Sequence, residues 1–183
     1  MALKSTIFKA ELQISDMDRH YYASHALTIA RHPSETDERM MLRLLAFALH
    51  ANERLEFTRG LSTVEEPELW RKSLTGEVEV WIELGQPDER RIRKACSQAE
   101  QVLLLTYGRG AEIWWQKLKP DVARFDKLSV LFVPPDACRA LAELADRNMQ
   151  LQVMLQEGQI WFSRGDRTVE IAPEWWMGSD EQT

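Results

Sequence analysis

Three glutamates in separate segments offer the oxygen ligands that a hard metal ion needs. Glu38 lies early in a stretch of helical periodicity, Glu68 follows a proline, and Glu83 comes late in a stretch of alternating apolar and polar residues. Mg²⁺ in proteins takes one or two carboxylates and completes its shell with water and substrate phosphate. Such an ion activates water and stabilises the departing oxygen in phosphodiester hydrolysis. If folding draws the three acids together, they predict an Mg²⁺ site, with Mn²⁺ as a substitute.

Glu83 belongs to a segment, residues 76–87, whose pattern predicts a strand. Val78, Val80, Ile82 and Leu84 alternate with polar residues and Trp81, so the two sets face opposite sides. One interpretation is a half-exposed antiparallel strand with a solvated acidic face. The other is a strand that carries chemistry at its end, where Gly85 precedes a helix. The strand alone does not decide between them.

Glu38 lies in a predicted helix that runs to about Ala51. Ser34 is the expected N-cap, with Asp37 at the third helical position of a capping box. At 3.6 residues per turn, Glu38 falls on the apolar face, with Glu35 nearer its edge and Arg43 on the far side. An unpaired buried carboxylate costs several kcal/mol, so Glu38 needs a cation, an arginine or hydrogen bonds.

A basic helix is expected directly after the strand of Glu83, from Pro87 at its first position to about Glu100. Gln86 precedes it, and it carries Arg91 and Lys94 one and two turns in. Its basic residues predict either a solvated face or a surface that contacts phosphate. The buried run at residues 101–107 completes a strand, helix, strand unit with parallel strands.

The other segments predict a mixed α/β (α+β) fold with a central mixed β-sheet flanked by helices, in one domain over residues 1–183. The chain opens with a predicted hairpin, residues 6–15 and 20–30, and residues 67–70 read as a capped turn or short helix. The further expected elements are a strand at 55–58, helices at 110–124 and 136–148, a strand at 128–133, and antiparallel strands at 150–156, 159–163 and 167–171. The tail after Gly178 is expected to fray.

Composition favours a cytoplasmic protein without a membrane segment, monomeric by default. The chain has 183 residues, two cysteines, and 23 basic against 29 acidic residues, a net charge of −6. No segment has the length or apolar content of a signal peptide or a membrane span. A constitutive DNA binder is usually basic, but a metal-dependent nuclease tolerates acidity because cations cover the charge near the phosphate. The four histidines share no ligand spacing, and the two Trp-Trp pairs favour packing over base stacking.

Pro67-Glu68, followed fifteen residues later by Glu83, resembles the Pro-Asp…Asp/Glu-X-Lys pattern of restriction-endonuclease-like enzymes. Longer blocks are similar to the YaeQ family of bacterial cytoplasmic proteins over essentially the whole chain. These blocks are HPSETDERMM at 32–41, LEFTRGLST at 55–63, WIELGQPDE at 81–89, RIRKAC at 91–96, MQLQV at 149–153, and Trp161. The resemblance implies a variant of the PD-(D/E)XK nuclease fold, and it transfers fold better than function.

Carried over by residue, the resemblance makes Glu38 the helix acid, Glu68 the Pro-Asp acid and Glu83 the strand acid. Two departures matter: Glu68 is a glutamate in place of aspartate, and Gly85 replaces the motif lysine. Gln86 would place the water, and Lys94 is the candidate for a migrated ammonium.

Two functions follow from this assignment. The first is Mg²⁺-dependent hydrolysis of DNA or RNA, with Arg91 or Lys94 at the phosphate. The second is a non-catalytic nucleic-acid-binding or transcription-related protein on a degenerate nuclease fold.

Overall fold

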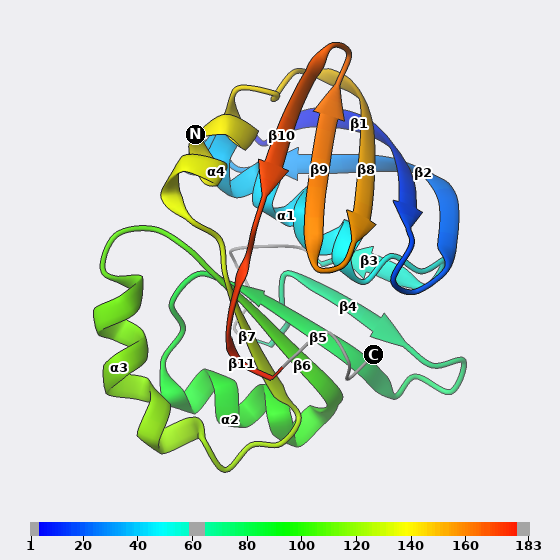
Figure 1. The fold of residues 1–183 in the computed structure, drawn as a ribbon. Coiled ribbons are helices and arrows are strands. Elements are labelled where there is room, and N and C mark those ends of the chain that lie inside the picture. Colours follow the sequence, from blue (N-terminus) through cyan, green and yellow to red (C-terminus); the bar gives the residue numbers. More distant parts are fainter. Residues whose placement is uncertain (1–3, 59–64, 179–183) are drawn as a thin grey trace. The chain divides into compact units, whose positions relative to one another are not determined.

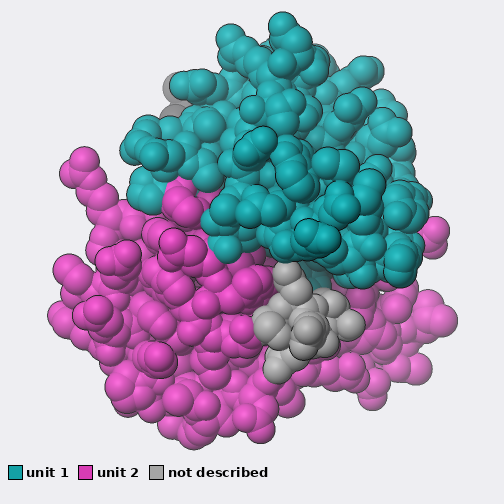
Figure 2. Space-filling model, viewed as in Figure 1, with its two compact units in different colours: residues 1–51, 135–173 teal, residues 52–134, 174–183 magenta. Residues whose placement is uncertain are grey.

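The computed structural model describes residues 4–58 and 65–178, which divide into two compact units (Figure 2). Unit 1 comprises Met1–Ala51 and Pro135–Pro173, and unit 2 comprises Asn52–Pro134 and Glu174–Thr183. The described residues form four helices and eleven strands in two mixed sheets (Figure 1). The predicted mixed class is confirmed, and its strands are shared between two sheets instead of forming one central sheet.

Unit 1 is a five-stranded sheet in the order β10-β9-β8-β1-β2 with two helices. The predicted opening hairpin is present, because β1 and β2 pair antiparallel along their whole length. The C-terminal meander is also present, but its first strand lies parallel to β1, with Leu12 opposite Leu151. The elements are β1 (Thr6–Asp16), β2 (Tyr21–Arg31), α1 (Asp37–Leu49), α4 (Pro135–Ala142), β8 (Asn148–Gln156), β9 (Gln159–Arg164) and β10 (Arg167–Ile171).

Helix α1 begins later than its sequence predicts. Its N-cap is Thr36, whose hydroxyl accepts a hydrogen bond from the backbone N–H of Arg39 at 3.1 Å, so Ser34 is not the cap. Every residue from Met40 to Ala48 is buried, including Arg43. The helical wheel placed Arg43 on the side away from the apolar face, but α1 has no solvated side between Met40 and Ala48.

Unit 2 is a six-stranded sheet in the order β11-β7-β6-β5-β4-β3. The predicted parallel core is confirmed, since β5 pairs with β6 and β6 with β7 in parallel. On one side β4 and β3 continue antiparallel, and on the other β11 pairs antiparallel with β7. The elements are β3 (Leu55–Phe57), β4 (Leu69–Lys72), β5 (Val78–Leu84), α2 (Glu89–Gln98), β6 (Ala99–Thr106), α3 (Ala111–Val122), β7 (Leu128–Phe132) and β11 (Glu174–Met177).

Several boundaries in unit 2 differ from the sequence prediction. The segment from Leu69 is the strand β4, not a turn or short helix, because its backbone pairs with β5. Asp88 is the N-cap of α2 and accepts from the N–H of Arg91, so Pro87 precedes the helix. Strand β11 was not foreseen. Part of the block at 55–63 and the predicted fraying after residue 178 fall on residues outside the described ones.

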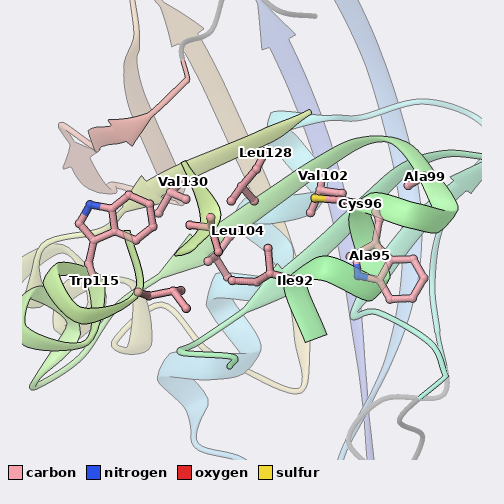
Figure 3. Close-up of a cluster of buried hydrophobic side chains, with 12 residues drawn as sticks. Ile92, Ala95, Cys96, Ala99, Val102, Leu104, Trp115, Leu128 and Val130 are labelled. Atoms are coloured by element: carbon pink, nitrogen blue, oxygen red, sulfur yellow. The ribbon is translucent and has the colours of Figure 1, made fainter. Parts of the chain in front are cut away.

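A buried cluster packs α2 and α3 against one face of this sheet (Figure 3). Ile92 and Cys96 of α2 meet Val102 and Leu104 of β6, and Trp115 of α3 closes the cluster. Its other members are Trp81, Ala95, Ala99, Leu118, Val122, Leu128 and Val130. Because residues two apart on a strand share a face, the Trp81 face of β5 lies beneath α2. The half-exposed interpretation of this strand is therefore wrong at its C-terminal end.

Candidate functional site

Two of the three predicted acids lie side by side in unit 2. Glu68 directly precedes β4, whose first residue Leu69 pairs with Ile82 of β5, so Glu68 lies near Glu83, and its charge acts on the Glu83 carboxyl. The N–H of Glu68 donates to the carbonyl of Ile82 at 3.0 Å, which holds the backbone of Glu68 against β5. Glu68 is 9% exposed and Glu83 is 5% exposed. Two acids that are fifteen residues apart in the sequence therefore form a buried carboxyl pair in the fold.

Glu83 receives two hydrogen bonds, both on Oε1. The indole Nε1 of Trp81 donates at 2.8 Å, and Nε of Arg91 donates at 2.8 Å as part of an ion pair. Burial raises the pKa of the Glu83 carboxyl above its usual value, while the charge of Arg91 and the Trp81 hydrogen bond act in the opposite direction. The nearby Glu68 adds to the increase in this pKa. The protein thus holds an acid where its charged form is partly disfavoured.

Arg91 is the cation that meets the pair. It lies in the first turn of α2, and its guanidinium also donates to the backbone carbonyl of Glu66 at 2.7 Å. Lys94, the predicted migrated ammonium, forms an ion pair with the exposed Glu65 at 2.7 Å. The hydrogen bond from Lys94 lowers the pKa of Glu65. Of the two candidate cations, Arg91 is the one in contact with Glu83.

Gln86 and Gly85 show how the chain leaves β5. The side-chain amide of Gln86 donates to the carbonyls of Tyr107 at 3.1 Å and Arg109 at 3.2 Å, so it fastens the loop after β6. Gly85 has φ +103°, a conformation that side-chain-bearing residues rarely adopt, although a Cβ there would meet no atom within 4 Å. The position of the motif lysine is therefore occupied by a residue that the backbone conformation requires.

The third acid, Glu38, belongs to unit 1 and is half-buried on α1. Its charge helps to raise the pKa of the Cys138 thiol in α4 to about 12, after the larger effect of burial. The more deeply buried acid of this segment is Glu35, 7% exposed, which accepts from Arg39 at 2.8 Å and Arg43 at 2.6 Å. The sequence thus named the wrong acid as the inward one, and a role for Glu38 beside the pair stays a prediction.

The carboxyl pair offers the type of oxygen ligand that a hard cation prefers. Across residues 4–58 and 65–178, no group of three or more His, Cys, Asp and Glu side chains could hold a metal ion. Two carboxylates suffice for Mg²⁺ when water and substrate phosphate supply the other ligands. Both hydrogen bonds from Trp81 and Arg91 use Oε1 of Glu83, and Glu68 and Glu83 are the residues that would hold an ion.

The sequence did not single out Trp81 or the carbonyl of Glu66 as parts of the site. Trp81 could have been found from its position two residues before Glu83, on the same strand face.

The fold and the pair define a mixed α+β protein with a buried two-carboxylate site beside an arginine. The family model described as "YaeQ protein" matches residues 1–173, and the chain belongs to the YaeQ family. It is 51% identical to YaeQ of Salmonella typhi over 178 residues, which cover 97% of this chain and 98% of that protein. It is 48% identical to YaeQ of Escherichia coli K12 with the same coverage.

Solved structures agree with this assignment. The crystal structure of YaeQ from Xanthomonas axonopodis pv. citri matches with a TM-score of 0.92 and 48% identity, over 96% of this chain and 99% of that one. YaeQ from Pseudomonas syringae matches with a TM-score of 0.92 and 41% identity, over 96% and 98%. In the described part of this chain, no helix is both long and apolar enough to cross a membrane.

Proposed function

We propose that this protein is a cytoplasmic, monomeric, Mg²⁺-dependent phosphodiesterase that acts on nucleic acid, with Mn²⁺ as a substitute ion. One observation carries the proposal: Glu68, directly before β4, and Glu83, on β5, lie close enough for one charge to act on the other, and both are buried. Two like charges that share a buried position oppose each other and add little to stability. A buried acid with a perturbed pKa, as Glu83 has, is characteristic of functional sites.

The charge around the pair supports a cation partner. One guanidinium, that of Arg91, is hydrogen bonded to Glu83, while Glu68 raises the pKa of the same carboxyl. A divalent ion would relieve the repulsion between the two carboxylates at the point where they approach. The order antiparallel β4 and β5, α2, then parallel β6 fits the resemblance to the nuclease superfamily.

The residues of the chain have distinct parts in this proposal. Glu68 and Glu83 hold the ion, and Glu38 is the predicted third acid. The bound ion supplies an activated water and stabilisation of the departing oxygen. Gln86 donates its amide hydrogens to the loop after β6, which leaves its carbonyl oxygen to accept from a water. In the absence of the motif lysine, Arg91 supplies the positive charge near the phosphate.

A second candidate function is non-catalytic nucleic-acid binding, connected with transcription. The observation that favours it is the ion pair between Arg91 and Glu83 at 2.8 Å, which already neutralises one of the acids. A nuclease fold that had lost its ion would retain the basic α2 as a phosphate contact. The two functions differ in whether the acids bind an ion and whether the phosphodiester bond breaks.

Titration calorimetry with Mg²⁺ and Mn²⁺ tests the proposal, combined with cleavage of labelled DNA and RNA. We expect Glu68→Gln and Glu83→Gln each to weaken ion binding at least tenfold and to abolish cleavage. The matched control is Glu79→Gln, because Glu79 lies on the same face of β5 but forms its ion pairs with Arg54 and Arg71. Ion binding without cleavage by wild type would favour the second function. No ion binding at all would overturn the proposal.

A further inference from the structure

The contact between Arg91 and Glu83 places a cation of the chain itself beside the ion site. Nε of Arg91 lies 2.8 Å from Oε1 of Glu83, and the far end of the guanidinium is fixed by the carbonyl of Glu66 at 2.7 Å. The Glu83 side chain is only 6% exposed, whereas that of Arg91 is 26% exposed. The acid is therefore held in place, and the arginine is the partner with access to solvent.

We propose that Arg91 is a built-in competitor for the divalent cation: its guanidinium neutralises Glu83 in the ion-free protein and leaves this carboxylate when an ion binds. This inference rests on the proposed function and assigns the regulation of the same site. A guanidinium and a divalent ion on one buried carboxylate repel each other in a medium of low dielectric constant. Only one of the two can be the principal partner of Glu83.

The local structure allows the side chain to move while its backbone stays fixed. The N–H of Arg91 is held by the Asp88 cap at 2.9 Å, and the next residue, Ile92, is 1% exposed in the core beneath α2. Trp81 donates to the same oxygen from a fully buried position, so Glu83 keeps its orientation when Arg91 departs. The exchange therefore needs rotations of one long side chain, with a change in its hydrogen bond to the Glu66 carbonyl, and no rearrangement of the sheet.

Two quantities change in opposite directions if Arg91 competes with the ion. Removal of the guanidinium leaves a buried carboxylate without its cation, so the ion-free protein loses stability. The same removal strengthens ion binding, because one charge-assisted hydrogen bond no longer has to be broken. If Arg91 had a purely structural role, its removal would weaken both the stability of the protein and its binding of the ion.

Calorimetry with Mn²⁺ on Arg91→Met, Arg91→Lys and wild type tests the competition. We expect Arg91→Met to tighten the Kd by roughly tenfold, equivalent to one such hydrogen bond, and Arg91→Lys to stay near wild type because a cation remains. Arg93→Met is the matched control on the same helix, since Arg93 forms its ion pair with Glu89 and not with Glu83. Unfolding in urea without metal is the second measurement, with a loss of stability expected for Arg91→Met only.

A measurement on the unaltered protein covers the case in which Arg91→Met does not fold. The Nε–H resonance of Arg91, assigned by its absence in Arg91→Lys, is expected to shift and to exchange faster with water when Mg²⁺ is added. If the ion binds while this resonance stays unchanged, or binds Arg91→Met no more tightly, the competition is refuted and the proposed function stands. If no variant binds an ion, both the proposed function and the competition are overturned.

Discussion

The hydrogen bond from Trp81 to Glu83 gives the sharpest test of how the site is built. The Trp81→Phe variant keeps an aromatic ring in the core but removes the N–H that donates to Oε1 at 2.8 Å. A hydrogen bond to a charged group contributes about 1.5–3 kcal/mol, and the residual cavity of the smaller ring adds roughly 1 kcal/mol. Because Trp81 is 1% exposed, water cannot replace the lost donor. We therefore expect the free energy of unfolding to fall by about 2.5–4 kcal/mol.

Urea unfolding monitored by circular dichroism measures this loss, with Trp70→Phe as the matched control. Trp70 is the cross-strand partner of Trp81 and donates to Glu56 at 3.0 Å, but its acceptor is exposed. An exposed bond of this kind adds little, so the control should lose at least about 1 kcal/mol less. Equal losses in the two variants would refute the argument that the buried carboxylate depends on Trp81.

Three further predictions concern stability. Burial raises the pKa of Glu83 above 4.5, so the folded state binds a proton more tightly than the unfolded chain does. The free energy of unfolding of the wild type should therefore fall as pH rises from about 4.5 through the folded pKa. Glu83→Gln should remove this decline in urea melts between pH 4 and 8, and parallel pH profiles would contradict it. Gly85→Ala and Gly85→Lys should each lower the free energy of unfolding by about 1–2 kcal/mol, because φ is +103° although a Cβ would meet no other atom. Unchanged urea midpoints would show that the backbone relaxes. Glu35→Ala should lower the free energy of unfolding by about 3–5 kcal/mol, because the buried Arg43 loses its ion-pair partner. In a double-mutant cycle, the double variant with Arg43→Met should recover part of this loss.

Local patterns predicted the regular elements well. The alternation from Thr6 to Ser15 became β1, and the apolar run near Leu104 became the buried parallel strand β6, because each period matches one backbone geometry. Helix caps were harder to place. Thr36 and Ser34 are both good capping residues, and only the hydrogen bond to Arg39 distinguishes them.

Long-range pairing could not be predicted from the sequence. Nothing in the residues around Asn148 indicates that β8 lies parallel to β1, or that Glu174 begins a strand beside β7. Burial of charge was equally hidden, because a helical wheel assumes one solvated side and α1 has none from Met40 to Ala48. For this reason the helical periodicity points to Glu38, although Glu35 is the acid with two arginine partners.

The candidate site was predicted in part. Proline before one acid and a strand around the other were enough to select Glu68 and Glu83, whose proximity the pairing of β4 with β5 supports. The choice between Arg91 and Lys94 depended on which face of α2 meets the strand, and a single-residue shift in the helix start changes that face. The part of Glu38 stays a prediction because it belongs to the other unit.

The interleaved course of the chain has a consequence for how the protein is made. Unit 1 begins the sequence, yet β1 acquires its second neighbour, β8, only when Asn148 pairs with Lys9, after residues 52–134 of unit 2 have been synthesised. Until then, while the chain is still on the ribosome, β1 lacks the strand that lies beside Leu12 and Ile14 in the finished sheet. Such delayed contacts slow folding and favour aggregation of nascent chains. Translation stalled before β8 should therefore yield a chaperone-dependent, protease-sensitive product.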